Sequence, residues 1–142
     1  MTYLLDTCVI SELASKRAEP AVVRWIDGVD PESIHLSAVT IGEIQKGIEK
    51  ARDPRRKEIL KAWLHEELLV RFKHQILALD TEVFLAWGAL AGSLESRGLP
   101  MPAMDSLIAA TALHHRLVLV TRNEDDFQRS GVKLLNPWKM AI

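Results

Sequence analysis

The segment YLLDTCVI, residues 3–10, sets the pattern for the whole chain, because a short apolar run ends at Asp6 and a helical pattern starts at Thr7. Short apolar runs of this kind suit buried strands. Comparable runs lie at residues 34–36, 76–79 and 117–120, with a weaker one at 132–135. In parallel sheets, ligands bind beyond the carboxyl ends of the strands. The residues that directly follow each run are therefore the first candidates for chemistry.

Helical patterns fill the gaps between these runs. Val83, Trp87, Leu90 and Leu94 recur at the spacing of one helix face. We expect helices near residues 7–16, 20–29, 38–51, 55–72, 81–97 and 103–115. Strands that alternate with helices predict an α/β fold with a parallel sheet covered on both faces, since each crossover returns right-handed across the sheet.

Length and composition limit the class of protein. A chain of 142 residues with 48% hydrophobic residues is expected to form one domain over residues 1–142 with a sizeable core. Lysine and arginine number 18 against 19 aspartates and glutamates. This balance gives no overall electrostatic argument for nucleic-acid binding.

The N-terminus and the cysteine content indicate a location. Cys8 is the only cysteine, which excludes an intramolecular disulfide and a cysteine-rich zinc site and fits a reducing compartment. The N-terminus lacks the basic region of a signal peptide. The longest apolar stretch, residues 83–92, is about half of a bilayer span. We expect a cytoplasmic protein without a membrane role.

Acidic residues follow the predicted strands closely, at Asp6, Glu43, Asp105 and Asp126. The topology is expected to bring these four carboxylates to one edge of the sheet. Two carboxylates about 5 Å apart repel by about 3 kcal/mol at an effective dielectric constant near 20, so the group requires a neutralising cation. An oxygen-only set without histidine or cysteine favours magnesium or manganese over zinc.

Each acidic residue taken alone also fits an ordinary helix start. The segment Thr40 to Glu43 matches the S/T-x-x-E capping box. Asp105 could complement the dipole of a helix that begins near residue 102. Asn123 could be an N-cap that precedes Asp126 by three residues. Only the combination of the four positions favours a metal site.

Four segments in order resemble the PIN domain and, within it, the VapC-like ribonuclease toxins of type II toxin–antitoxin pairs. They are YLLDTCVI (3–10), LSAVTIGEI (36–44), PAMDSLIAA (102–110) and VTRNEDDF (120–127). The resemblance implies a three-layer α/β/α sandwich with a mostly parallel sheet of four to five strands. It also identifies Asp6, Glu43 and Asp105 as catalytic residues and metal ligands.

The fourth position of the site is open between two residues. Many relatives place an aspartate directly after the last core strand, whereas Asn123 stands first here and Asp126 follows. Either side chain could approach the metal. We assign Asp126 as the fourth catalytic residue and Thr7, Thr121 and Asn123 as supporting polar residues.

The resemblance implies a magnesium- or manganese-dependent endoribonuclease that hydrolyses RNA phosphodiesters and leaves 5′-phosphate and 3′-hydroxyl ends. Such a toxin inhibits translation or growth. The implied partners are RNA, a cognate antitoxin in an apolar groove that Trp25 or Trp63 could line, and a second copy in a homodimer. The alternative is a catalytically inactive PIN-like domain that acts as a binding or regulatory module.

Other enzyme classes fit the residues less well. A haloacid-dehalogenase-type phosphatase needs a second aspartate two residues after the first, where Cys8 stands. A receiver domain needs paired acids after the first strand, and Asp6 has no acidic neighbour. P-loop, G-x-S-x-G and G-x-G-x-x-G motifs are absent from the sequence.

A basic stretch between Lys46 and Lys57 has two interpretations. It contains six lysines and arginines against Glu49 and Asp53, which fits a solvated corner between two helices. It also fits a contact with the RNA backbone, which needs only a local cationic surface. With the four candidate site carboxylates set aside, the rest of the chain has three more basic than acidic residues.

Overall fold

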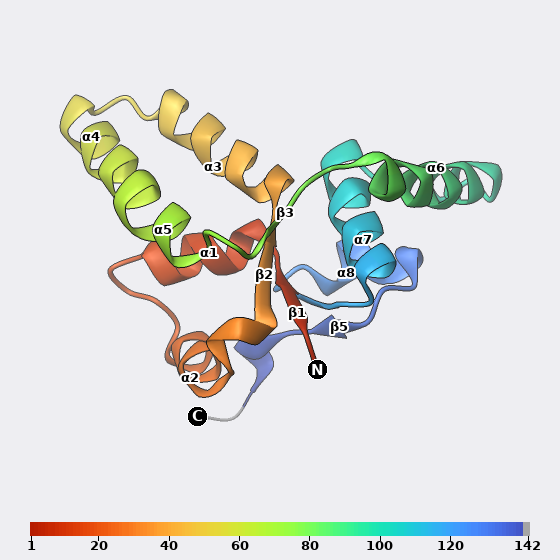
Figure 1. The fold of residues 1–142 in the computed structure, drawn as a ribbon, viewed down its shortest axis with the longest axis horizontal. Helices are drawn as coiled ribbons and strands as arrows, with labels where there is room; N and C mark the ends of the chain where they lie inside the picture. The colour runs from red at the N-terminus through yellow and green to blue at the C-terminus, as the bar shows by residue number, and fades with distance from the viewer. Residues whose placement is uncertain (141–142) are drawn as a thin grey trace.

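A five-stranded parallel sheet with helices on both faces forms the centre of the computed structural model, which describes residues 1–140 (Figure 1). The strands are β1 (Tyr3–Leu5), β2 (Ile34–Ser37), β3 (Ile76–Leu77), β4 (Val118–Val120) and β5 (Leu134–Leu135). Their order across the sheet is β3-β2-β1-β4-β5. The predicted α/β sandwich with a parallel sheet is confirmed. The predicted domain also includes residues 141–142, which lie outside the described residues.

The predicted helices are present, most of them within two residues of the expected ends. They are α1 (Thr7–Ala14), α2 (Pro20–Gly28), α3 (Ala38–Lys50), α4 (Pro54–Trp63), α5 (Leu69–Arg71), α6 (Thr81–Ser96) and α7 (Ala103–His115). The helix expected at 55–72 is divided, because the π-helical segment η2 (Leu64–Leu68) separates α4 from α5. Four short helices were not predicted: η1 (Pro31–Ser33), α8 (Glu124–Phe127), η3 (Gln128–Ser130) and η4 (Pro137–Lys139).

Two hydrophobic cores lie on the two faces of the sheet. Leu4 and Leu5 are both fully buried, and as neighbours in a strand they point to opposite faces. Leu5 packs in a core with side chains from α1 to α5, and Leu4 packs in a core with side chains from α7 and α8. In Figure 1, α1 to α5 accordingly lie on one side of the sheet and α6 to α8 on the other. The structure therefore has the expected three layers.

Three tryptophans, Trp25, Trp63 and Trp87, pack against the two hydrophobic cores. Trp25 contacts Tyr3 edge to face, with ring centroids 5.2 Å apart. The indole N–H of Trp87 donates a hydrogen bond of 2.9 Å to the Ser106 hydroxyl. Trp63 is partly buried against the core on the α1 side. Within residues 1–140, none of the helices combines the length and apolarity needed to cross a membrane.

Strand pairing brings the ends of three strands to one edge. In the register of β1 and β4, Leu5 lies opposite Val120. The Asp6 N–H extends this pairing with a hydrogen bond of 2.9 Å to the Val120 carbonyl. On the other side of β1, Leu4 lies opposite His35 of β2. The residues that follow β1, β2 and β4 therefore meet at the carboxyl edge of the sheet.

Candidate active site

Asp6 lies at the centre of this edge, between the end of β1 and the start of α1. Its carboxylate accepts hydrogen bonds from the Thr7 N–H and the Thr121 hydroxyl, both at 2.8 Å, and from the Cys8 thiol at 3.5 Å. The residue is only 6% exposed. Burial raises the pKa of Asp6, although these hydrogen bonds act in the opposite direction, and the charge of Glu43 raises it further.

Thr7 links Glu43 to Asp6, because its hydroxyl contacts Glu43 and its backbone N–H contacts Asp6. The Thr7 hydroxyl donates a hydrogen bond of 2.6 Å to Glu43 Oε1 and lies 3.0 Å from the buried Thr40 hydroxyl. The capping box from Thr40 to Glu43 is not formed. Instead, α3 begins at Ala38 because Ser37 is its N-cap and accepts a hydrogen bond of 3.0 Å from the Val39 N–H. The Glu43 carboxylate is therefore directed towards the β1 end and not towards its own helix start.

Asp105 lies in the first turn of α7, which has Pro102 as an N-cap without a side-chain hydrogen bond. Burial is the main cause that raises the pKa of Asp105 to about 6. The negative charges of Asp6, Asp126 and Glu43 raise it further, in that order. Four carboxylates from four separate segments thus act on one another, as the topology predicts.

The segment after β4 supplies Thr121, Asn123 and Asp126. Thr121 is fully buried, and its hydroxyl donates to Asp6 while it accepts a hydrogen bond of 3.0 Å from the Asn123 N–H. Asn123 precedes α8, but its side chain makes no capping hydrogen bond. Asp126 is one of the charges that raise the pKa of Asp105. Of the two candidates for the fourth position, Asp126 thus has the electrostatic link to the other carboxylates.

The metal-binding capacity of these residues can be judged from their chemistry. Within residues 1–140, no group of three or more histidine, cysteine or acidic side chains lies close enough together to hold a metal ion. Magnesium, however, keeps several water ligands and is usually bound by only one or two carboxylates. None of the four site carboxylates forms an ion pair with lysine or arginine in the described part of the chain. The donor set therefore fits a hard divalent cation.

Two side chains of the site were not predicted. Cys8 contacts both Asp6 and the Thr121 hydroxyl, at 3.5 and 3.6 Å, and burial raises the pKa of its thiol. Thr40 was attributed to helix capping and instead contacts Thr7. The signal for both was the strand order: β1 lies between β2 and β4, so the residues after these strands are close in space.

A groove of about 940 Å³ starts at this site and runs between α1, α3 and α4. Thr7 and Glu43 line its inner part, and Ile59, Leu60 and Trp63 line it from α4. Ile59 is 59% exposed, so the groove has an unburied apolar side. The expectation that Trp63 lines a groove of the N-terminal helices agrees with this structure, whereas Trp25 packs against Tyr3 and is not among the lining residues.

Comparisons with known proteins give the family. The family model of the PIN domain matches residues 3–133. The chain is 33% identical to toxin FitB of Neisseria gonorrhoeae over 95% of this chain and 97% of that protein. It is 32% identical to VapC ribonuclease Y4jK of Sinorhizobium fredii over 97% of this chain and 99% of the relative.

A solved structure agrees with these sequence matches. The crystal structure of FitAcB from Neisseria gonorrhoeae contains a chain that superposes with a TM-score of 0.92 at 32% identity. The match covers 98% of this chain and all of the other. The fold, the order of the four motifs and both sequence matches lead to the same assignment. This chain belongs to the PIN domain family and, within it, to the VapC-like toxins.

Proposed function

We propose that this protein is a divalent-metal-dependent endoribonuclease and the toxin of a toxin–antitoxin pair. The observation that carries the proposal is that the charges of Asp6, Glu43 and Asp126 all act on Asp105, while none of the four carboxylates pairs with a lysine or arginine within residues 1–140. Carboxylates that repel one another lower stability, and such perturbed groups are concentrated at functional sites. The ribonuclease and toxin names of the two relatives support the same activity.

In this proposal Asp6, Glu43 and Asp105 hold magnesium or manganese. The ion would supply a bound water of lowered pKa and stabilise charge on the phosphoryl oxygens of RNA. Thr121 and the Thr7 N–H fix the Asp6 carboxylate, and the Thr7 hydroxyl fixes Glu43. Residues that hold metal ligands in place are usually needed for full affinity.

Asp126 completes the site from α8, opposite Asp105. Its carboxylate is exposed and carries its charge close enough to Asp105 to raise the pKa of that residue. Asn123 lies at the same end of the segment, where its N–H is held by Thr121. We assign Asp126 to the catalytic group and Asn123 to a supporting contact with the phosphate or with metal-bound water.

We propose that the groove between α1, α3 and α4 receives the antitoxin. Its apolar side suits the apolar face of a peptide, which is one of the recurrent ways in which proteins bind helices. Because the groove begins at Thr7 and Glu43, a bound peptide would also cover the approach to the carboxylates. Antitoxin binding and inhibition would then be one event.

We further propose a cytoplasmic location, from the cysteine content and the N-terminus, and a homodimer, from the family resemblance. An RNA substrate and a single reduced cysteine are consistent with the cytoplasm. Light scattering on the purified chain would give the mass in solution. A mass of one chain would exclude the homodimer.

RNA cleavage tests the proposed activity directly. Purified protein is incubated with RNA and Mg²⁺, with and without chelator, beside Asp6→Asn and Asp105→Asn variants. We expect each substitution and the chelator to lower the cleavage rate about a hundredfold or more. The matched control is Asp53→Asn, which changes an exposed helix cap and should leave the rate unchanged. Cleavage that survives both substitutions would refute the proposed site, and an unaltered chain that does not cleave RNA would favour the inactive binding module.

A further inference from the structure

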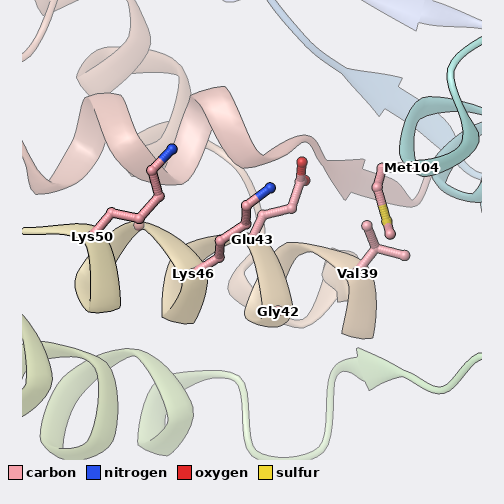
Figure 2. A pocket seen from close by; sticks show the side chains of 7 residues that line it. Val39, Gly42, Glu43, Lys46, Lys50 and Met104 are labelled. Atoms are coloured by element: carbon pink, nitrogen blue, oxygen red, sulfur yellow. The ribbon is translucent and has the colours of Figure 1, made fainter.

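One face of α3 continues from Glu43 into two lysines (Figure 2). Lys46 and Lys50 follow Glu43 at steps of three and four residues, so the three side chains lie on the same side of the helix. Both lysines are exposed, and neither forms an ion pair within residues 1–140. The neighbouring Glu49 accepts a hydrogen bond of 3.0 Å from the Gln45 side chain. The two lysines therefore stay unpaired within the described chain, and they outnumber Glu43, the one carboxylate among the residues that line this hollow.

These lysines line a hollow of about 470 Å³ that begins at the candidate active site. Its floor includes Gly42 and Gly47 of α3, and its far wall is Met104 of α7. A Cβ atom added at either glycine would meet no atom within 4 Å, so close packing at that position does not explain two residues that weaken a helix. They leave the helix backbone open to a molecule that lies on it.

The far wall connects the hollow to the carboxylates. Met104 is 52% exposed and directly precedes Asp105 in α7. Val39 and Met104 form an apolar end, Glu43 lies between, and the lysines form a cationic end, as Figure 2 shows. A nucleotide has the same division between an apolar base and an anionic backbone.

We propose that this hollow binds the nucleotides next to the scissile phosphodiester, with Lys46 and Lys50 contacting successive backbone phosphates and Met104 lying against a base. The proposal rests on the ribonuclease function proposed above. Four residues of helix advance about 6 Å, which matches the distance between neighbouring phosphates of an extended single strand. Single-stranded nucleic acids are commonly held by such a cationic track beside apolar side chains.

The structure also divides the basic stretch of residues 46–57 into separate surfaces. Lys46 and Lys50 lie in the hollow, whereas Arg56 lines the groove on the other side of α3 and Arg55 lies on α4. Of these residues, only the two lysines share a surface with both Glu43 and Met104. The backbone contact is therefore assigned to them.

RNA binding without cleavage tests the proposal. Fluorescence anisotropy of a labelled, mixed-sequence single-stranded RNA is measured in chelator over a range of salt concentrations. We expect the Lys46→Gln/Lys50→Gln double variant to bind on the order of tenfold more weakly than the unaltered chain. The slope of log affinity against log salt should fall by about 1.4, at about 0.7 for each phosphate contact on a single strand.

Two controls separate a contact from a general effect of charge or folding. Lys73→Gln removes an exposed lysine that precedes β3, at the opposite edge of the sheet, and should leave affinity and slope unchanged. Lys46→Arg/Lys50→Arg keeps both charges and should retain RNA binding. A double glutamine variant that binds like Lys73→Gln would overturn the proposal. Polyglutamate binding is measured in the same way. If the double glutamine variant loses affinity for polyglutamate but not for RNA, the hollow binds an acidic peptide and the proposal is overturned.

The outcome is independent of the nuclease test. If the unaltered chain cleaves RNA, the glutamine double variant should raise KM with little change in kcat, because these lysines bind substrate equally in the ground and transition states. Unchanged KM would overturn the role of the lysines and leave the nuclease in place. Lysine-dependent binding by a chain that does not cleave RNA would support the hollow and refute the nuclease.

Discussion

Acidic residues near helix starts serve two different purposes in this molecule. Asp30, Asp53 and Asp80 each accept a 3.0 Å hydrogen bond from a backbone N–H of the helix that they begin. At the carboxyl edge of the sheet, α3 is capped by Ser37, and α7 and α8 have no side-chain cap. The carboxylates early in these three helices, Glu43, Asp105 and Asp126, contribute instead to one electrostatic cluster.

The difference lies in what each carboxylate does for stability. A capping aspartate satisfies a free N–H and favours the folded chain. Burial first, and then the charges of the other clustered carboxylates, raise the pKa of Asp105 to about 6, so the ionised form of Asp105 is disfavoured in the folded chain. Asp6 belongs to both groups, since it caps α1 through the Thr7 N–H and also lies in the cluster. Carboxylates that lower the stability of the folded chain indicate a functional site.

The largest effect that distinguishes the clustered carboxylates from the capping ones is expected on metal affinity when Thr7 is changed. Thr7→Val removes the hydroxyl that donates to Glu43 at 2.6 Å and keeps a side chain of similar shape. We expect metal affinity to fall about tenfold to a hundredfold, as for other residues that hold metal ligands in place. Mn²⁺ titration by calorimetry measures this affinity.

Thr7→Ser is the control, because it restores the hydroxyl and should restore the affinity. If valine and serine variants bind Mn²⁺ equally well, Glu43 is not held by Thr7 in the working site. Glu43 would then belong with the carboxylates that serve only their own helix.

A smaller effect, on the rate of RNA cleavage, is expected to distinguish two neighbouring aspartates of α8, Asp125 and Asp126. Asp126 raises the pKa of Asp105, whereas Asp125 is not among the charges that do so. We expect Asp126→Asn to lower RNA cleavage about tenfold and Asp125→Asn to change it by less than about twofold. Equal rates for the two variants would remove Asp126 from the cluster and make Asn123 the better candidate.

The sequence was sufficient to predict the sheet and the positions of the carboxylates. Apolar runs and alternating helices predicted the parallel strands, and the topology rule predicted that Asp6 and Asp105 would meet. The prediction of one continuous helix over 55–72 was wrong in one respect. The apolar periodicity cannot distinguish the π-helical turn Leu64–Leu68 from an α-helix. Three strands, β3, β4 and β5, were predicted longer than they are, for example to residue 79 where β3 ends at Leu77.

The side-chain contacts of the site could not be predicted in the same way. Thr40 to Glu43 fits the capping-box pattern as well as a true helix start does. What decides against the box is Ser37, which takes the N-cap three residues earlier. That choice depends on where β2 ends, and strand ends are the least certain feature of a sequence pattern. The contact between Thr7 and Glu43 depends in turn on where α3 begins.

The smallest effect concerns stability, and its sign differs between the two groups of carboxylates. The pKa of Asp105 is about 6 in the folded chain, against about 3.9 when unfolded. The folded chain therefore gains stability from this group below about pH 4 and loses it as the pH rises through 6. In chelator at pH 7, Asp105→Asn should raise the free energy of unfolding by about 1.5 kcal/mol, after allowance for solvent screening.

The gain should disappear below about pH 4, where Asp105 becomes neutral in both states, and urea unfolding at several pH values measures this. Asp53→Ala is the opposite case: it removes an exposed cap and should lower stability by about 1 kcal/mol at pH 7. If Asp105→Asn also lowers stability at pH 7, the Asp105 carboxylate stabilises its own helix as the caps do. The contrast between capping and clustered carboxylates would then fail at the residue on which it depends most, because Asp105 is the one that all three other charges act upon.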